Sequence, residues 1–113
     1  MEDITYWDCN AAFGRPTAGL VKPCISTSEL LAEMDWHGIS AAVVHHALMV
    51  DQSPVVGNAA LSEELDGQPR LIGTWAILPP QTRELAESSV FFREMAQSNI
   101  RGLWAFPEEH RYI

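Results

Sequence analysis

Apolar residues cluster in four short runs, at residues 4–9, 40–47, 71–78 and 101–106. The runs are rich in aliphatic, β-branched and aromatic side chains, and each is short enough for a single strand. The middle two are apolar almost throughout, which is typical of strands that are covered on both faces. The last two are followed directly by proline, which cannot continue a strand ladder. The pattern therefore predicts four strands.

The segment between the first two runs ends in a predicted helix. Ser26 and Glu29 have the spacing of a capping box, which satisfies free N–H groups at a helix start. Apolar residues continue at helical spacing from Leu30, and Gly38 stands where a glycine commonly ends a helix. The Gly- and Pro-rich stretch before Ser26 is expected to be an irregular connection.

Two further helices are predicted between the remaining strands. One covers residues 54–66, with Pro54 in its first turn and Gly57 as a residue that weakens it locally. The other covers residues 83–98. Alternating strands and helices indicate βαβ units, in which the strands run parallel.

Four parallel strands and three helices make about half of a (β/α)8 barrel, which needs about 250 residues. We therefore expect a single α/β domain over residues 1–113 that is the N-terminal half of a longer barrel. Two alternatives stay open: a barrel-like pair of copies, or a small open α/β sheet that is complete in itself. The fourth strand leaves an uncovered apolar edge, so we also expect a homo-oligomer to form through this edge.

Composition and charge narrow the class of protein. The formal net charge is -8, and the seven basic residues are scattered. This excludes a nucleic-acid-binding surface and does not favour binding to an anionic membrane. The sequence has neither a long apolar stretch nor a basic N-terminus of the kind that begins a secretory signal. Cys9 and Cys24 are therefore expected as reduced thiols in a cytoplasmic protein.

In parallel α/β folds, functional groups gather at the carboxyl ends of the strands. Six residues near these predicted ends are candidate site residues: Asp8, Asn10, His45, His46, Trp75 and His110. Each also has a structural interpretation. Asp8 and Asn10 are common turn residues, Trp75 has apolar neighbours typical of a core position, and a single histidine is often a hydrogen-bonded core residue. Alternation along the second strand sends one of His45 and His46 toward the barrel interior and the other toward the helices.

Residues 4–14, Ile-Thr-Tyr-Trp-Asp-Cys-Asn-Ala-Ala-Phe-Gly, resemble the first strand of the amidohydrolase superfamily, whose pattern is Asp-x-His-x-His-x-Gly. Asp8 and Gly14 match this pattern, whereas Asn10 and Ala12 stand at the positions of the two metal-binding histidines. Residues 102–112 are similar to the Pro-x-x-His-x-Tyr ending of one amidohydrolase-related branch, and the Gly-Asn pair at 57–58 also occurs in that branch.

The resemblance implies a metal-dependent enzyme that hydrolyses or decarboxylates a small organic substrate. It implies catalytic roles for Asp8, His46 and His110, and substrate contacts from Asn10, His45 and Trp75. No metal ligand is assigned within this chain. A divalent ion, zinc or manganese, would be held mostly by histidines and an aspartate on later strands. Because both first-strand histidines are replaced, a non-catalytic barrel relative or a small α/β ligand-binding or interaction module is the alternative.

Overall fold

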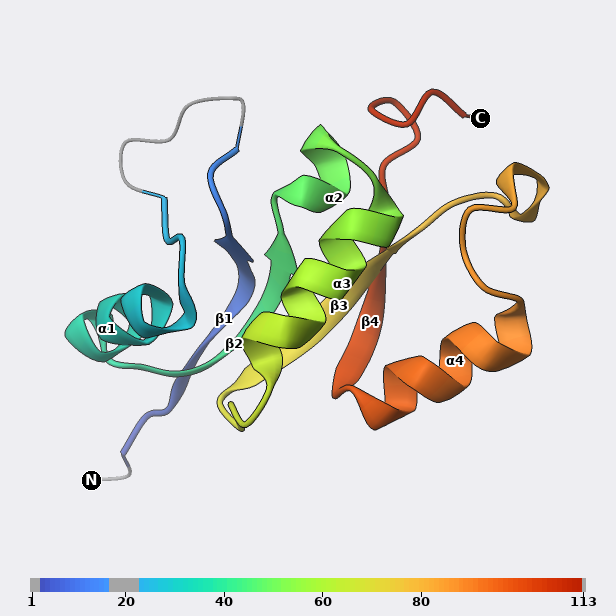
Figure 1. The fold of residues 1–113 in the computed structure, drawn as a ribbon. Coiled ribbons are helices and arrows are strands. Elements are labelled where there is room, and N and C mark those ends of the chain that lie inside the picture. The colour runs from blue at the N-terminus through green and yellow to red at the C-terminus, as the bar shows by residue number, and fades with distance from the viewer. Residues whose placement is uncertain (1–2, 17–22, 113) are drawn as a thin grey trace.

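The computed structural model describes residues 3–16 and 23–112 and has an α/β fold (Figure 1). All strands of the sheet are parallel, and they lie in the order β1-β2-β3-β4. The strands are β1 (Tyr6–Phe13), β2 (Ile39–His46), β3 (Leu71–Ile77) and β4 (Ile100–Ala105). The predicted parallel α/β arrangement, equivalent to about half of a (β/α)8 barrel, is therefore confirmed.

Helices connect successive strands. They are α1 (Thr27–His37), α2 (Leu48–Asp51), α3 (Pro54–Leu65) and α4 (Ser88–Gln97), with a short 3₁₀ turn, η1 (Pro80–Thr82). Right-handed crossovers between strands in chain order bring the connecting helices to one face of the sheet. The described part of the chain contains no helix with the length and apolarity needed to cross a membrane.

Capping residues explain where α1 begins and ends. The Ser26 hydroxyl accepts a hydrogen bond from the Glu29 N–H (3.3 Å), as the predicted capping box requires. The Glu29 carboxylate accepts a return bond from the N–H of Ile25 rather than from that of Ser26 (2.8 Å). Gly38 adopts a left-handed conformation (φ 69°) and ends the helix.

Two predicted boundaries were wrong. The first strand runs from Tyr6 to Phe13 instead of ending at Cys9, with a register irregularity between Asp8 and Ala11. The third predicted helix begins at Ser88, five residues later than expected. The reason lies at Arg83, which has a left-handed backbone (φ 54°) after η1 and so interrupts helical geometry.

The core lies between the sheet and the helices. Side chains on β2 alternate: Val44 and His46 are buried toward the helices, whereas Val43 and His45 are half-buried on the opposite face, which we call the open face. Buried side chains from every helix and strand fill the core: Phe13, Leu30, Met34, Val44, Met49, Leu61, Leu71, Trp75, Phe91, Met95 and Ile100.

The side chain of Asn58 joins α3 to β3. Strands β2 and β3 pair only over Ala42 to Val44. Beyond this point, the Asn58 side chain donates to the carbonyl of Ala76 (3.0 Å) and accepts from its N–H (2.8 Å). Asn58 is buried, so it supplies the two hydrogen bonds that a neighbouring strand would otherwise give.

Close contact between α2 and α3 depends on Gly57. A Cβ atom at this position would lie 2.3 Å from the backbone nitrogen of Met49 and 2.5 Å from its Cα. The helix-weakening glycine of the sequence is therefore the residue that lets the short helix α2 pack against α3. This contact fixes the position of Met49.

The two outer strands of the sheet are β1 and β4. Each therefore has one side on which no other described strand pairs. Tyr6 and Trp7 on β1 and Leu103 on β4 are large apolar side chains that remain exposed.

Candidate functional site

Three of the six candidate residues come together near the carboxyl ends of the parallel strands. His45 and His46 are the last two residues of β2, and His110 follows β4. His110 reaches back toward β2, because its Nε2 atom lies 2.7 Å from the carbonyl oxygen of Met49 in α2. The loop after β4 is thus tied to the segment that follows β2.

His46 is a buried, hydrogen-bonded residue, which agrees with the structural interpretation of this histidine rather than with a catalytic one. It points toward the helices, and its Nδ1 atom accepts a hydrogen bond from the N–H of Leu48 at the start of α2 (3.1 Å). Its ring also packs against Gly14, where an added Cβ would come within 2.8 Å of the imidazole. The geometry gives His46 the role of fixing α2, and its predicted catalytic role has no support from these contacts.

His45 lies on the open face and contacts the ring of Trp104, with 5.4 Å between ring centroids. Its neighbour on β1 is Ala12. The Nδ1 atom of His45 is buried and has no hydrogen-bond partner among the described residues. Of the two adjacent histidines, His45 therefore has the ring nitrogen that is available to a ligand, whereas the Nδ1 atom of His46 is occupied by Leu48.

An aromatic row extends from His45 to His110 and consists of His45, Trp104, Phe106 and His110. Trp104 stacks on Phe106 (5.9 Å, 12°), and Phe106 meets His110 edge-on (5.7 Å). Trp104 is held in place because its indole N–H donates to the hydroxyl of Thr74 (2.8 Å). That hydroxyl in turn donates to the carbonyl of Val44, so its proton is not available for chemistry.

The hydrogen bond of His110 defines its tautomer. A carbonyl oxygen can only accept, so Nε2 of His110 must carry the proton that it donates to Met49. In the neutral imidazole, Nδ1 then holds a lone pair. This Nδ1 atom is buried and, like that of His45, has no partner within the described residues. His110 is therefore an oriented proton acceptor.

Asp8 and Asn10 lie within β1, away from its carboxyl end. The neighbour of Asp8 is Ala42, in the middle of β2. The Asp8 carboxylate accepts a hydrogen bond from the N–H of Asn10 (2.8 Å), which is the local turn expected of these residue types. The expectation that both residues lie at the carboxyl end of the first strand was wrong, because that strand continues to Phe13.

Trp75 lies on the face of the sheet opposite to the aromatic row. Its indole N–H donates to the hydroxyl of Ser62 (3.2 Å), and its ring packs against Phe91 (5.3 Å). The side chain is buried beneath α3 and α4. Its apolar neighbours in the sequence indicate this core position. Trp75 therefore lies apart from His45 and His110.

The histidines do not form a metal centre with the other described residues. A zinc site needs at least three protein ligands. Residues 3–16 and 23–112 contain no group of three or more His, Cys, Asp or Glu side chains that could hold a metal ion. These residues alone therefore do not fit the metal that the resemblance implies. A zinc or manganese ion held mostly by residues outside this chain stays a prediction.

Only part of the aromatic row could be predicted from the sequence. Gly102, Trp104 and Phe106 recur at every second position, which is the spacing of one strand face. Trp104 pairs with Ala76, the residue after Trp75, so the two tryptophan rings lie on opposite faces of the sheet. The hydrogen bond between His110 and the Met49 carbonyl could not be predicted from the sequence, because every residue has the same backbone carbonyl group.

Acidification below pH about 6.5 is expected to destabilise the protein. Burial lowers the pKa of His45 below its ordinary value of 6.5, and the charge of His46 lowers it further. A hydrogen bond with the Ala11 backbone raises this pKa, but by less. Burial also lowers the pKa of His46, although Glu64 acts in the opposite direction. Between the lowered values and pH 6.5, the unfolded chain binds more protons than the folded one, so stability present above pH 6.5 is lost on acidification.

Urea titrations between pH 5 and pH 8 check this prediction. His46→Gln is expected to reduce the pH dependence, because glutamine binds no proton and still offers an acceptor to Leu48. His37→Gln, on the exposed side of α1, is the matched control. A free energy of unfolding that stays constant or rises as the pH falls from 6.5 to 5 would contradict the prediction.

Comparison of the chain with family models, curated proteins and solved structures finds no match.

Proposed function

We propose that this chain forms part of an amidohydrolase-like cytoplasmic enzyme that hydrolyses or decarboxylates a small organic substrate. The substrate binds on the open face against the aromatic row. His45 and His110 transfer protons at its two ends. The resemblance of residues 4–14 and 102–112 to the superfamily and the parallel sheet in chain order support this proposal.

The observation that carries the proposal is a pair of buried imidazole nitrogens that have no hydrogen-bond partner among residues 3–16 and 23–112. Buried polar atoms in folded proteins nearly always have a hydrogen-bond partner, and exceptions often mark functional groups. The Nδ1 atoms of His45 and His110 are both such exceptions, and they stand at opposite ends of one row of rings. A polar ligand between them would satisfy both atoms.

The lowered pKa of His45 and the tautomer of His110 suit general acid–base chemistry. The lowered pKa of His45 keeps its imidazole neutral at neutral pH, as a general base requires. His110 is fixed as an acceptor at Nδ1 by its bond to Met49. Trp104 and Phe106 between them offer flat apolar surface for an aromatic or other apolar part of the substrate.

Activity measurements with single variants test the proposal. Phenyl acetate, N-acetylphenylalanine and benzoylacetate are the probes for ester hydrolysis, amide hydrolysis and decarboxylation, each assayed with and without added zinc or manganese. His45→Gln and His110→Gln are each expected to lower kcat by about 100-fold or more, the usual contribution of a positioned acid or base. His37→Gln is the control, because it makes the same substitution on the surface.

A pH profile separates catalysis from folding. In the parent protein, kcat/KM is expected to fall at acid pH as His45 becomes protonated, and His45→Gln should remove that part of the profile. Turnover that is unchanged in both variants would contradict the proposal. Binding of the probes at the aromatic row without turnover under any condition would support the alternative, a non-catalytic ligand-binding module, which the replaced histidines at positions 10 and 12 favour.

A further inference from the structure

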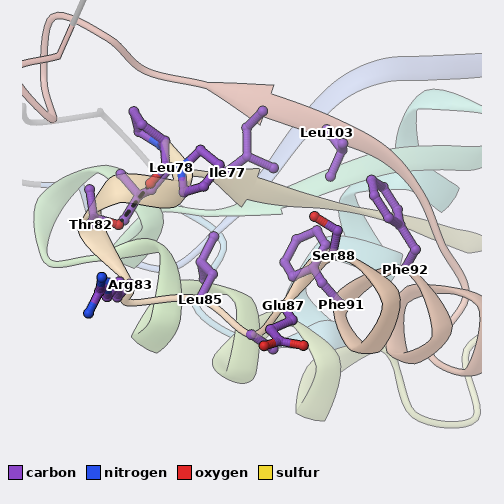
Figure 2. A pocket seen from close by; sticks show the side chains of 13 residues that line it. Ile77, Leu78, Thr82, Arg83, Leu85, Glu87, Ser88, Phe91, Phe92 and Leu103 are labelled. Atoms are coloured by element: carbon purple, nitrogen blue, oxygen red, sulfur yellow. Dashed lines mark hydrogen bonds between the residues drawn. The ribbon is translucent and has the colours of Figure 1, made fainter.

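A separate groove lies on the helix side of the sheet, over the outer strand β4. It has a volume of about 770 Å³, within the usual range for small-molecule sites, and runs between the end of β3, the segment leading to α4, and α4 itself (Figure 2). His45 and the aromatic row belong to the opposite face, so the groove is independent of the proposed catalytic site.

One end of the groove is apolar and accessible. Phe92 on α4 is 54% exposed and Leu103 on β4 is 40% exposed, and both line the groove together with Ile77, Leu85 and Phe91. Figure 2 shows Phe92 and Leu103 close to the same end of the groove. Exposed apolar side chains that gather around a concave surface are typical of a ligand site.

The other end of the groove carries a positively charged side chain. Arg83 lines the groove, and Figure 2 shows it at the end away from Phe92 and Leu103. Within the described residues, the ion pairs of the chain do not involve its guanidinium group.

We propose that this groove binds a small amphipathic monocarboxylate. The carboxylate pairs with the planar guanidinium of Arg83, which suits its geometry, and the apolar part of the ligand covers Phe92 and Leu103. Glu87 is the one carboxylate among the lining residues, and it selects against ligands with a second negative charge.

Calorimetric titration with three eight-carbon ligands tests the charge requirement. Octanoate is the probe, octanamide is its neutral counterpart, and octylamine carries the opposite charge. We expect octanoate to bind at least 10-fold more tightly than either of the other two. Arg83→Gln should abolish the preference for octanoate over octanamide, whereas Arg93→Gln, an exposed arginine on α4 outside the groove, should retain it.

Two further variants test the apolar end of the groove and its independence from the aromatic row. Leu103→Thr, which shortens the apolar side chain and places a residue of high strand propensity on β4, should weaken octanoate and octanamide alike. His45→Gln should leave octanoate binding unchanged, which distinguishes the groove from the proposed catalytic site. Equal binding of octanoate and octanamide, or no effect of Arg83→Gln, would overturn the proposal. So would a dimer in sedimentation that excludes octanoate and dissociates in Leu103→Thr, because a second copy would then occupy the groove.

Discussion

Asn58→Leu is expected to lower the free energy of unfolding by about 3–5 kcal/mol. The substitution keeps the approximate size of the side chain but removes both hydrogen bonds to Ala76. The N–H and carbonyl of Ala76 then stay buried without partners, and each unsatisfied group costs about 1–3 kcal/mol. A small domain has only about 5–15 kcal/mol of stability, so this single side chain accounts for a large share of it.

Urea unfolding followed by tryptophan fluorescence measures the effect. Gln97→Leu is the matched control, because it exchanges an amide for leucine on the exposed side of α4 and is expected to change stability by less than about 0.5 kcal/mol. A loss of less than about 1 kcal/mol in Asn58→Leu would mean that the Asn58 side chain does not stand in for a missing strand partner of β3.

Gly57→Ala is expected to destabilise the protein by about 2–4 kcal/mol, although helix propensity alone predicts a gain of about 1 kcal/mol. The added Cβ would lie 2.3 Å from a backbone nitrogen of Met49, where no side-chain rotation relieves the overlap. Helix α2 must therefore move away from α3. Because the Met49 carbonyl holds Nε2 of His110, the movement is also expected to release the loop after β4.

The opposite substitution on the same helix provides the comparison. Ala59→Gly, at an exposed position of α3, is expected to cost only the propensity difference of about 1 kcal/mol. Urea unfolding compares the two variants, and imidazole NMR signals report the state of His110. If Gly57→Ala is more stable than the parent protein, the close packing of α2 on α3 is not a feature of the molecule in solution.

The regular part of the fold follows from local sequence patterns. The apolar runs identify β2, β3 and β4 to within one residue at either end, because buried strands need continuous apolar side chains. The cap residues Ser26 and Gly38 place α1 because they act within a few residues of the helix ends. Helix α3 begins at Pro54 and ends one residue before the predicted boundary, for the same local reasons.

The features that periodicity missed depend on contacts between distant residues. The first strand extends to Phe13 because β2 pairs with it up to His46, and no local pattern carries that information. The four-residue helix α2 depends on Gly57 and on the cap from His46, which belong to neighbouring elements. The candidate site was predicted in part, since strand ends selected His45 and His110, whereas Asp8, Asn10, His46 and Trp75 lie elsewhere or serve the fold.

Among the described residues, no strand pairs with the outer side of β1 or of β4, so each side presents backbone N–H and C=O groups to which a further strand could bind. Because the strands follow chain order without a reversal, a further parallel strand beside β4 or beside β1 would continue the same arrangement. Addition at either margin requires no rearrangement of the existing hydrogen bonds. We therefore expect any pairing between copies of the chain at high concentration to involve these two margins.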